Sequence, residues 1–225
     1  MNGFFVRIIL AVLVFGSAVA QAATYGVTSP NYTSTTDFTP PCSLGTCTNF
    51  TLAMKVSGTF DVPTLAANLT NSNIAAAVTA FSFSDGITTY ASTDPAVRIY
   101  VFQVTTDASG KLTNVNILLE KWLSGGSPHA VNDLFSYMSV TGSAVYANNN
   151  TWCGNVAMSL AGVADSCTSA TLGPQVSRAS APGGTTFTAP GAAVAVPTLS
   201  EWAQIVLASL MTLIGLWQAR RLSRR

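Results

Sequence analysis

Charged residues are scarce in this chain of 225 residues, because Asp, Glu, Lys and Arg together make up only 8% of it. Soluble globular proteins usually contain about 25% charged residues. Hydrophobic residues reach 48%, which is too much apolar content for an intrinsically disordered chain. The composition therefore argues against an ordinary cytosolic enzyme and against a disordered protein.

Basic residues are few in the central part of the chain. Between Ala23 and Val196 five basic residues stand against eight acidic ones, a net charge of −3. No basic cluster occurs there, so this part lacks the electrostatic footprint of a nucleic-acid-binding protein. The other basic residues lie near the two ends of the chain, and we expect no nucleic-acid partner.

The first 22 residues have the parts of a secretory signal peptide. Arg7 supplies the positive charge, Ile8 to Gly16 form a short apolar core, and Ala18-Val19-Ala20 and Ala20-Gln21-Ala22 are small-residue cleavage sites. An uncleaved N-terminal anchor is the alternative, but the apolar core is short for a membrane span. We therefore predict that residues 1–22 are a signal peptide read by the Sec export machinery.

Cysteine occurs four times, at Cys42, Cys47, Cys153 and Cys167. An even number of cysteines in an exported chain predicts two disulfides. Three pairings are open, and we favour Cys42–Cys47 with Cys153–Cys167, because each pair closes a loop rich in small or polar residues. Neither spacing matches a zinc motif, so we predict no metal site.

Histidine occurs only once, as His129. Hydrolytic catalysis normally needs a positioned base, and His129 lies in a segment typical of a surface loop. No GxSxG motif surrounds any serine, and Asp85, Asp94 and Asp107 lie in expected turns. We therefore predict no catalytic residue, no cofactor and a protein that is not an enzyme.

Residues 23–172 predict one all-β domain, an antiparallel β-sandwich with a jelly-roll arrangement as one option. Alternating apolar residues from Asn49 to Val62 predict a long strand. Val97 to Thr105 and Leu112 to Trp122 predict a hairpin around a turn at residues 107–110. Further strands are expected at residues 76–84, 87–91, 140–146 and 152–160, with a turn at Asn148-Asn149-Asn150.

Six aromatic residues on or near these strands could stack against sugar rings: Tyr90, Tyr100, Trp122, Tyr137, Tyr146 and Trp152. A strand aromatic in a sandwich lies more often in the core. An extracellular polysaccharide is therefore a second candidate partner rather than the first expectation.

Residues 173–195 are dominated by Gly, Pro, Ala, Ser and Thr, which predicts a flexible linker. Trp202 to Ala219 then form an uncharged run that would span about 27 Å as a helix, close to the roughly 30 Å hydrocarbon core of a bilayer. Four arginines follow and predict a cytoplasmic stop-transfer end: Arg220, Arg221, Arg224 and Arg225. We expect one transmembrane helix, residues 202–219, in contact with membrane lipid.

A short polar motif stands directly before this run. It reads Val196, Pro197, Thr198, Leu199, Ser200, Glu201, Trp202. The motif, the apolar run and the basic end together resemble the IPTL-CTERM protein-sorting tails of Gram-negative bacteria, relatives of the PEP-CTERM tails. For residues 196–225 the resemblance implies recognition by an exosortase-like processing enzyme, a membrane-embedded cysteine transpeptidase that cuts near the Pro-Thr pair.

These observations predict an exported, non-enzymatic cell-surface or extracellular-matrix protein. Its precursor would be anchored in the inner membrane with the β-domain in the periplasm. One alternative is a carbohydrate-binding surface module with the same delivery. Another is a plain single-pass inner-membrane protein with a periplasmic β-domain.

Overall fold

Two antiparallel β-sheets dominate the computed structural model of this chain, which describes residues 22–40, 47–190, 206 and 209. The chain divides into two compact units, Met1–Gly191 and Ala192–Arg225, and both sheets belong to the first. The smaller sheet has the strand order β13-β1-β3-β5-β6. Its strands are β1 (Ala23–Thr28), β3 (Ser57–Val62), β5 (Ala80–Ser84), β6 (Thr89–Ala91) and β13 (Thr186–Thr188).

The larger sheet has the order β2-β12-β10-β9-β8-β7-β4, and β11 pairs with β10 outside this path. Its strands are β2 (Ser34–Thr36), β4 (Ser72–Asn73), β7 (Val97–Thr106), β8 (Leu112–Trp122), β9 (Leu134–Thr141), β10 (Ala144–Ala157), β11 (Ser166–Thr171) and β12 (Ser177–Pro182). A short 3₁₀ helix, η1 (Ala75–Ala77), follows β4. The all-β fold with antiparallel sheets is thus confirmed.

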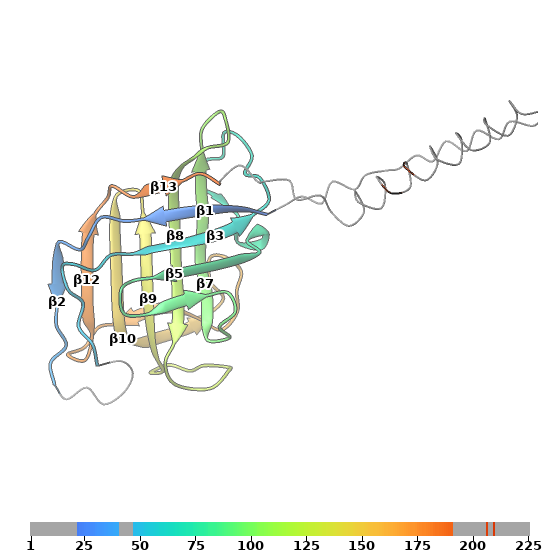
Figure 1. Cartoon of the computed structure of the whole chain (residues 1–225). Coiled ribbons are helices and arrows are strands. Elements are labelled where there is room, and N and C mark those ends of the chain that lie inside the picture. Colours follow the sequence, from blue (N-terminus) through green and yellow to red (C-terminus); the bar gives the residue numbers. More distant parts are fainter. Residues whose placement is uncertain (1–21, 41–46, 191–205, 207–208, 210–225) are drawn as a thin grey trace, which may run out of the picture. The chain divides into compact units, whose positions relative to one another are not determined.

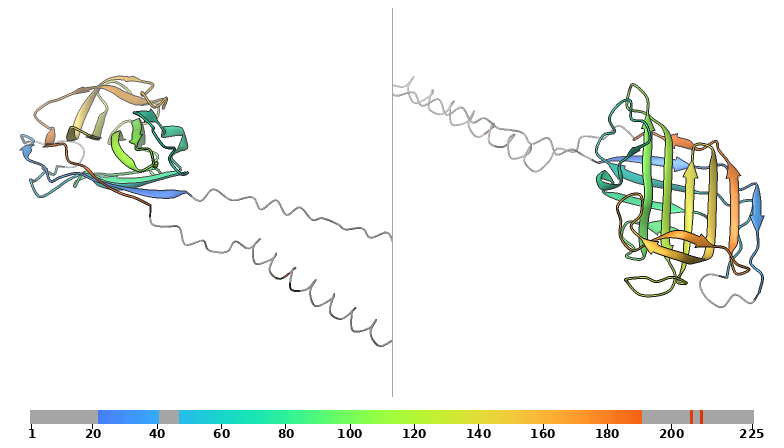
Figure 2. Two further views of the ribbon diagram at one scale, coloured as in Figure 1. Left: turned by 90° about the horizontal axis from the view of Figure 1, so that it is seen from above. Right: turned by 180° about the vertical axis from the view of Figure 1, so that it is seen from behind.

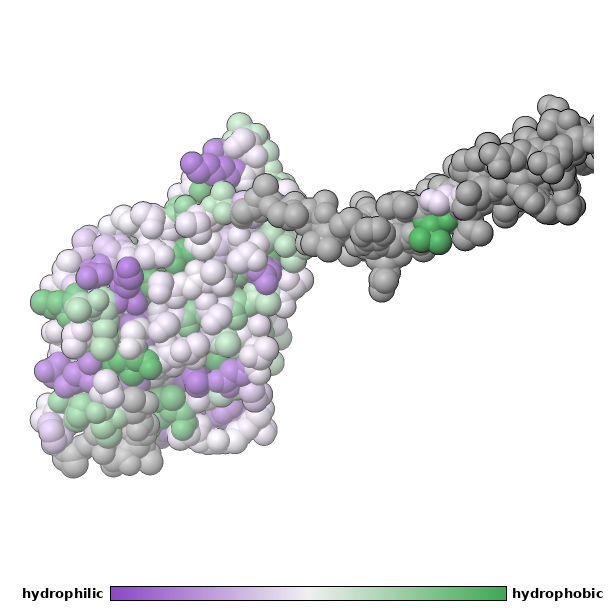
Figure 3. All heavy atoms as spheres, in the orientation of Figure 1, coloured by the Kyte–Doolittle hydropathy of each residue, from purple (hydrophilic) through white to green (hydrophobic). Residues whose placement is uncertain are grey.

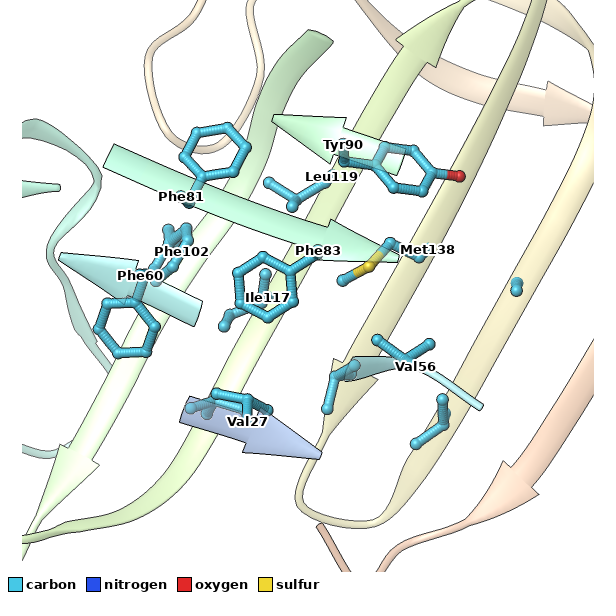
Figure 4. Packing of buried hydrophobic residues seen from close by; sticks show 14 of the residues in the cluster. Val27, Val56, Phe60, Phe81, Phe83, Tyr90, Phe102, Ile117, Leu119 and Met138 are labelled. Atoms are coloured by element: carbon cyan, nitrogen blue, oxygen red, sulfur yellow. The ribbon is translucent and has the colours of Figure 1, made fainter. Parts of the chain in front are cut away.

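The two sheets lie face to face, and the strands of the smaller sheet run across those of the larger one (Figure 1). Phe60 of β3 and Phe81 and Phe83 of β5 pack around Phe102 of β7, with ring centroids 5.1 to 6.4 Å apart. Figure 4 shows these rings together with Ile117, Leu119 and Met138 of the larger sheet. Alternation along each strand puts these side chains on the inner faces, where their burial stabilises the fold.

The predicted hairpin of β7 and β8 is confirmed, with pairing from Val97↔Lys121 to Thr106↔Leu112. The long strand predicted over residues 49–62 is wrong in its first half, since β3 begins only at Ser57. The backbone N–H of Phe50 donates instead to the hydroxyl of Ser177, and a turn closes when the N–H of Met54 donates to the carbonyl of Thr51. This turn leaves Leu52 56% exposed.

The turn predicted at Asn148-Asn149-Asn150 is also wrong, because these residues lie inside the continuous strand β10. They are buried, and the hydroxyl of Ser136 donates to Oδ1 of Asn149 at 2.8 Å. Asn150 has a φ of 61°, a left-handed conformation that asparagine tolerates better than most residues. The asparagines therefore form a bulge in the strand, with a register shift between Asn148 and Thr151.

The flexible linker predicted over residues 173–195 is wrong for the stretch that forms β12 and β13. β12 pairs with both β10 and β2, and Ser177, Ala179 and Ala181 are buried. Small side chains there fit between the sheets, so the composition that suggested flexibility reflects close packing. The β-domain thus continues past residue 172, while residues 191–195 lie outside the described residues.

The predictions for the two ends of the chain concern residues that mostly lie outside the described ranges. The signal peptide over residues 1–22 lies outside them except for Ala22, and so do the sorting motif and the four C-terminal arginines. Of the predicted helix over residues 202–219, only Val206 and Ser209 are described, both helical. Among the described residues, no helix is long and apolar enough to cross a membrane.

We expect Phe60→Ala to lower the free energy of unfolding by about 3–5 kcal/mol. Phe60 is fully buried and stacks on Tyr25 at 5.3 Å as well as contacting Phe102. Urea denaturation of the purified protein measures the change. The exposed Leu52→Ala is the control and should change stability by less than about 0.5 kcal/mol. Equal losses in the two variants would contradict the placement of the core.

Candidate functional site

A groove of about 500 Å³ lies on the outer face of the larger sheet, the face turned toward the viewer in the right-hand view of Figure 2. Side chains of β2, β8, β9, β10 and β12 line it. The opposite side of the sandwich, seen in Figure 3, shows mostly pale residues with scattered hydrophobic and hydrophilic ones. The groove therefore belongs to the larger sheet alone.

Strand pairing aligns a row of side chains across this face. Directly opposite one another on β8, β9, β10, β12 and β2 stand Glu120, Tyr137, Asn148, Arg178 and Thr36. Paired residues point to the same face of a sheet, and adjacent strands are about 4.8 Å apart. Four steps across the strands therefore make a row about 19 Å long.

A second row runs beside the first, two residues along each strand. It consists of Leu118, Ser139, Tyr146, Ser180 and Ser34. Tyr146 is 50% exposed, and Tyr137 stacks on Phe135 with ring centroids 5.6 Å apart. The two tyrosines thus stand in neighbouring rows, surrounded mainly by hydroxyl and amide side chains.

A smaller hollow of about 190 Å³ adjoins the groove and shares Leu118 and Tyr137 with it. Tyr100, Glu120 and residues of β11 also line this hollow. The disulfide Cys153–Cys167 attaches β11 to β10, and it packs with Trp122 and Phe135 in a second buried cluster. The disulfide therefore helps to hold β11 in place as a wall of the hollow.

The predicted pairing of Cys153 with Cys167 is confirmed, with their Cα atoms 5.7 Å apart. Cys47 is also disulfide-bonded. Its predicted partner, Cys42, lies outside the described residues, so that pairing stays a prediction.

Glu120 is a buried carboxyl group at the edge of the groove and is only 2% exposed. The backbone N–H of Cys167 donates to its Oε2 at 3.0 Å. Burial raises the pKa of Glu120 to about 8, and this hydrogen bond and the charge of Arg98 offset only part of the effect. Glu120 therefore carries a proton at neutral pH.

Arg178 is the charged residue that lines the groove itself. Its side chain is exposed, and within the described part of the chain it enters none of the ion pairs. Burial raises the pKa of the Tyr137 phenol, and the charge of Arg178 acts in the opposite direction. The charge of Arg178 thus acts on the phenol of Tyr137 across the groove.

His129 lies in a loop, as expected, but its side chain is only 7% exposed. Its ring stacks on Trp122 with centroids 4.2 Å apart, and its Nδ1 is 2.7 Å from Oδ2 of Asp165. Arg98 contacts the same oxygen at 3.0 Å, and the hydroxyl of Ser127 donates to it at 3.1 Å. Because serine and histidine share one carboxylate, the cluster lacks the serine-to-histidine contact of a hydrolase triad.

Asp165 holds this cluster together. Burial would raise its pKa, but hydrogen bonds from the backbone and ring of His129 and from Arg98 lower it to about 2. The carboxylate is therefore charged at every pH near neutrality. No group of three or more His, Cys, Asp or Glu residues within the described ranges is arranged to hold a metal ion.

The six aromatic candidates separate into groups. Tyr137 and Tyr146 line the groove, and Tyr100 lines the adjoining hollow. Tyr90 is fully buried and donates from its hydroxyl to Asp85 at 2.9 Å. The remaining two are Trp122, which is buried, and Trp152, which lines neither hollow.

Sequence reasoning missed three residues of the site. Arg178 lies in the predicted linker and Asn148 in a predicted turn, and Glu120 is one of the eight acidic residues that enter the charge count. The one available signal was for Glu120, since an acid that directly follows Leu118 and Leu119 in a hydrophobic strand is a candidate for burial.

Residues 194–221 match the family model described as the IPTL-CTERM motif. The chain carries an IPTL-CTERM motif. An IPTL-CTERM motif indicates an exported protein with a C-terminal sorting signal, and it implies processing by an exosortase-like enzyme. No curated protein and no solved structure matched the chain.

We expect the stability of the wild-type protein to fall relative to that of Glu120→Gln as pH rises from about 4.5 to about 8. The folded state keeps the Glu120 proton until its pKa of about 8, whereas the unfolded chain releases it near the ordinary value of 4.5. Stability falls with pH wherever the folded state binds more protons. Glutamine does not titrate and should lack this slope.

Urea denaturation of both proteins at pH 5, 6, 7 and 8 measures the difference. The advantage of Glu120→Gln should grow steadily across this range. A difference that stays constant with pH would mean that Glu120 is not protonated in the folded state.

Proposed function

We propose that this protein is an exported, non-enzymatic cell-surface or extracellular-matrix protein whose β-domain binds a polysaccharide. The observation that carries the proposal is the pair of tyrosines, Tyr137 and Tyr146, in a groove lined by hydroxyl and amide groups. The groove and the adjoining hollow together follow the row from Glu120 to Thr36 and would hold the polysaccharide across the strands of the larger sheet.

The chemistry of the groove suits sugars. A pyranose ring has apolar C–H faces that pack on aromatic rings, and hydroxyl edges that need hydrogen-bond partners. The tyrosines offer flat amphipathic surfaces. Asn148, Ser139 and Ser180 offer both donors and acceptors.

Delivery by the C-terminal tail completes the proposal. The Sec machinery exports the chain, and an arginine-flanked helix over residues 202–219 anchors the precursor in the inner membrane with the β-domain in the periplasm. An exosortase-like enzyme then processes the tail near Pro197. The IPTL-CTERM match supports this route, and the alternative is a plain single-pass anchor that keeps its tail.

The described residues that line the groove and the adjoining hollow include no pair of carboxyl groups, which supports a binding role over hydrolysis. Glycoside hydrolases use two carboxyl groups on either side of the scissile bond. Glu120 is the one carboxylic residue that lines the groove or the adjoining hollow within the described residues. The cluster of His129 and Asp165 lines neither the groove nor the adjoining hollow.

We expect Tyr146→Ala to weaken polysaccharide binding about tenfold, which corresponds to about 1.4 kcal/mol, because the ring supplies a stacking surface. Tyr146→Phe keeps the ring and should bind nearly as well as the wild type. A glycan array followed by calorimetry on the full-length protein, in a detergent that contains no sugar, provides the measurement.

Leu160→Ala is the control, because Leu160 is exposed and lies outside the groove. Equal binding by Tyr146→Ala and the wild type would contradict the groove as the site. An array without any bound glycan would contradict the binding function.

Intact-mass analysis of protein from the native host should find a C-terminus near Pro197–Leu199. The exosortase-like enzyme is expected to cut there, and Pro197→Ala should therefore accumulate with its tail attached. Wild-type protein that ends at Arg225 and stays in the inner membrane would instead establish a plain single-pass anchor.

A further inference from the structure

We infer that the groove selects an acidic polysaccharide, with one carboxylate of the bound stretch held by Arg178 while sugar rings stack on Tyr137 and Tyr146. The inference rests on the proposed polysaccharide binding and adds the class of polysaccharide. Three features of the described residues support it: a guanidinium that enters none of the ion pairs, a groove lining without a second charged residue, and the distance along the row from Arg178 to Tyr137.

The guanidinium of Arg178 is available to a ligand. Elsewhere in the described domain, Arg98 pairs with Asp165 at 3.0 Å and Lys121 pairs with Asp94 at 2.9 Å. Arg178 is exposed and, within the residues described, takes part in no such pair. Arginine presents a planar fork of donors that matches the two oxygens of a carboxylate.

Arg178 is the one charged residue among the described residues that line the groove, because Asp37, which follows the strand partner Thr36 on β2, does not line it and forms no ion pair with Arg178. Glu120 is the acid nearest to it along the row, three strands away, and it is protonated at neutral pH. The groups that face Glu120 are Arg98 on β7, Tyr137 on β9 and the backbone N–H of Cys167 on β11. The groove is therefore cationic at neutral pH, although residues 23–196 carry a net charge of −3.

The spacing along the row allows one ligand to reach both kinds of group. Asn148 separates Arg178 from Tyr137, and these residues occupy adjacent strands. Two steps between strands amount to about 10 Å between Arg178 and Tyr137. A chain lying across the strands can therefore stack a ring on a tyrosine and place an acid group at Arg178.

A single cation also limits the number of charges that the groove can hold. Nucleic acids bind proteins through several phosphate contacts to lysine and arginine, and the groove offers one such contact. A polysaccharide with sparse acid groups, whose other sugars make neutral contacts, fits this arrangement better than a densely charged polymer does.

Methyl-esterified oligogalacturonides that carry either one free carboxylate or none test the inference on the full-length protein in sugar-free detergent. The oligomer with one carboxylate should bind about tenfold more tightly than the neutral one at low salt. Arg178→Gln should abolish this difference, so that the variant binds the two oligomers equally. Arg178→Lys keeps the charge without the fork and should keep part of the preference.

Lys55→Gln is the matched control, because it removes one positive charge at an exposed residue that does not line the groove. It should leave both affinities unchanged. Equal binding of the two oligomers, or an equal effect of Lys55→Gln and Arg178→Gln, would overturn the inference while leaving polysaccharide binding in place. Absence of binding to both oligomers and to a glycan array would overturn the proposed function as well. Tighter binding of an oligothymidine than of the acidic oligomer would overturn the choice of polymer.

Discussion

The hollow beside the groove depends on the bulge of buried asparagines in β10. Before the bulge, Val145 and Ala147 face the core between the sheets. Asn148 pairs with Tyr137 and Thr151 pairs with Phe135, so β10 advances by three residues where β9 advances by two. This extra residue reverses the alternation, so that Cys153 faces outward and joins the second buried cluster.

Because the alternation of side chains reverses, the two halves of β10 have different structural roles. The first half pairs with β12 and places Tyr146 and Asn148 in the groove. The second half pairs with β11, where the outward Cys153 can reach Cys167. Without the extra residue Cys153 would point into the main core, and β11 would lose its covalent attachment. The hollow beside the groove and its wall on β11 thus follow from one local irregularity.

Much of the fold follows from patterns that the sequence displays, and the failures have a physical cause. The hairpin of β7 and β8 was predictable because its residues alternate and its turn contains Asp107 and Gly110. β12 was not, because a strand of serine and alanine has no hydrophobic alternation and is ordered by β10 and β2 on either side. For the same reason Arg178 could not be assigned to a site.

The three asparagines mislead in a related way. Asparagine favours turns because its side chain bonds to nearby backbone and tolerates left-handed conformations. In β10 the same properties stabilise a bulge, since Asn150 takes the left-handed conformation while Asn149 bonds to the distant Ser136. Local preference therefore identified an irregular position correctly but could not show that the strand continues through it.

The scarcity of charge, which first argued against an enzyme, also gives Arg178 its importance. A surface crowded with charged residues would surround any single guanidinium with others of both signs. Here Arg98 and Lys121 are already paired, and Glu120 is neutral because it is buried. At physiological ionic strength, charges more than about 8 Å apart in solvent are largely screened, so distant carboxylates have little influence on the groove. Among the described residues, the charge of the groove lining is then that of a single arginine outside these ion pairs.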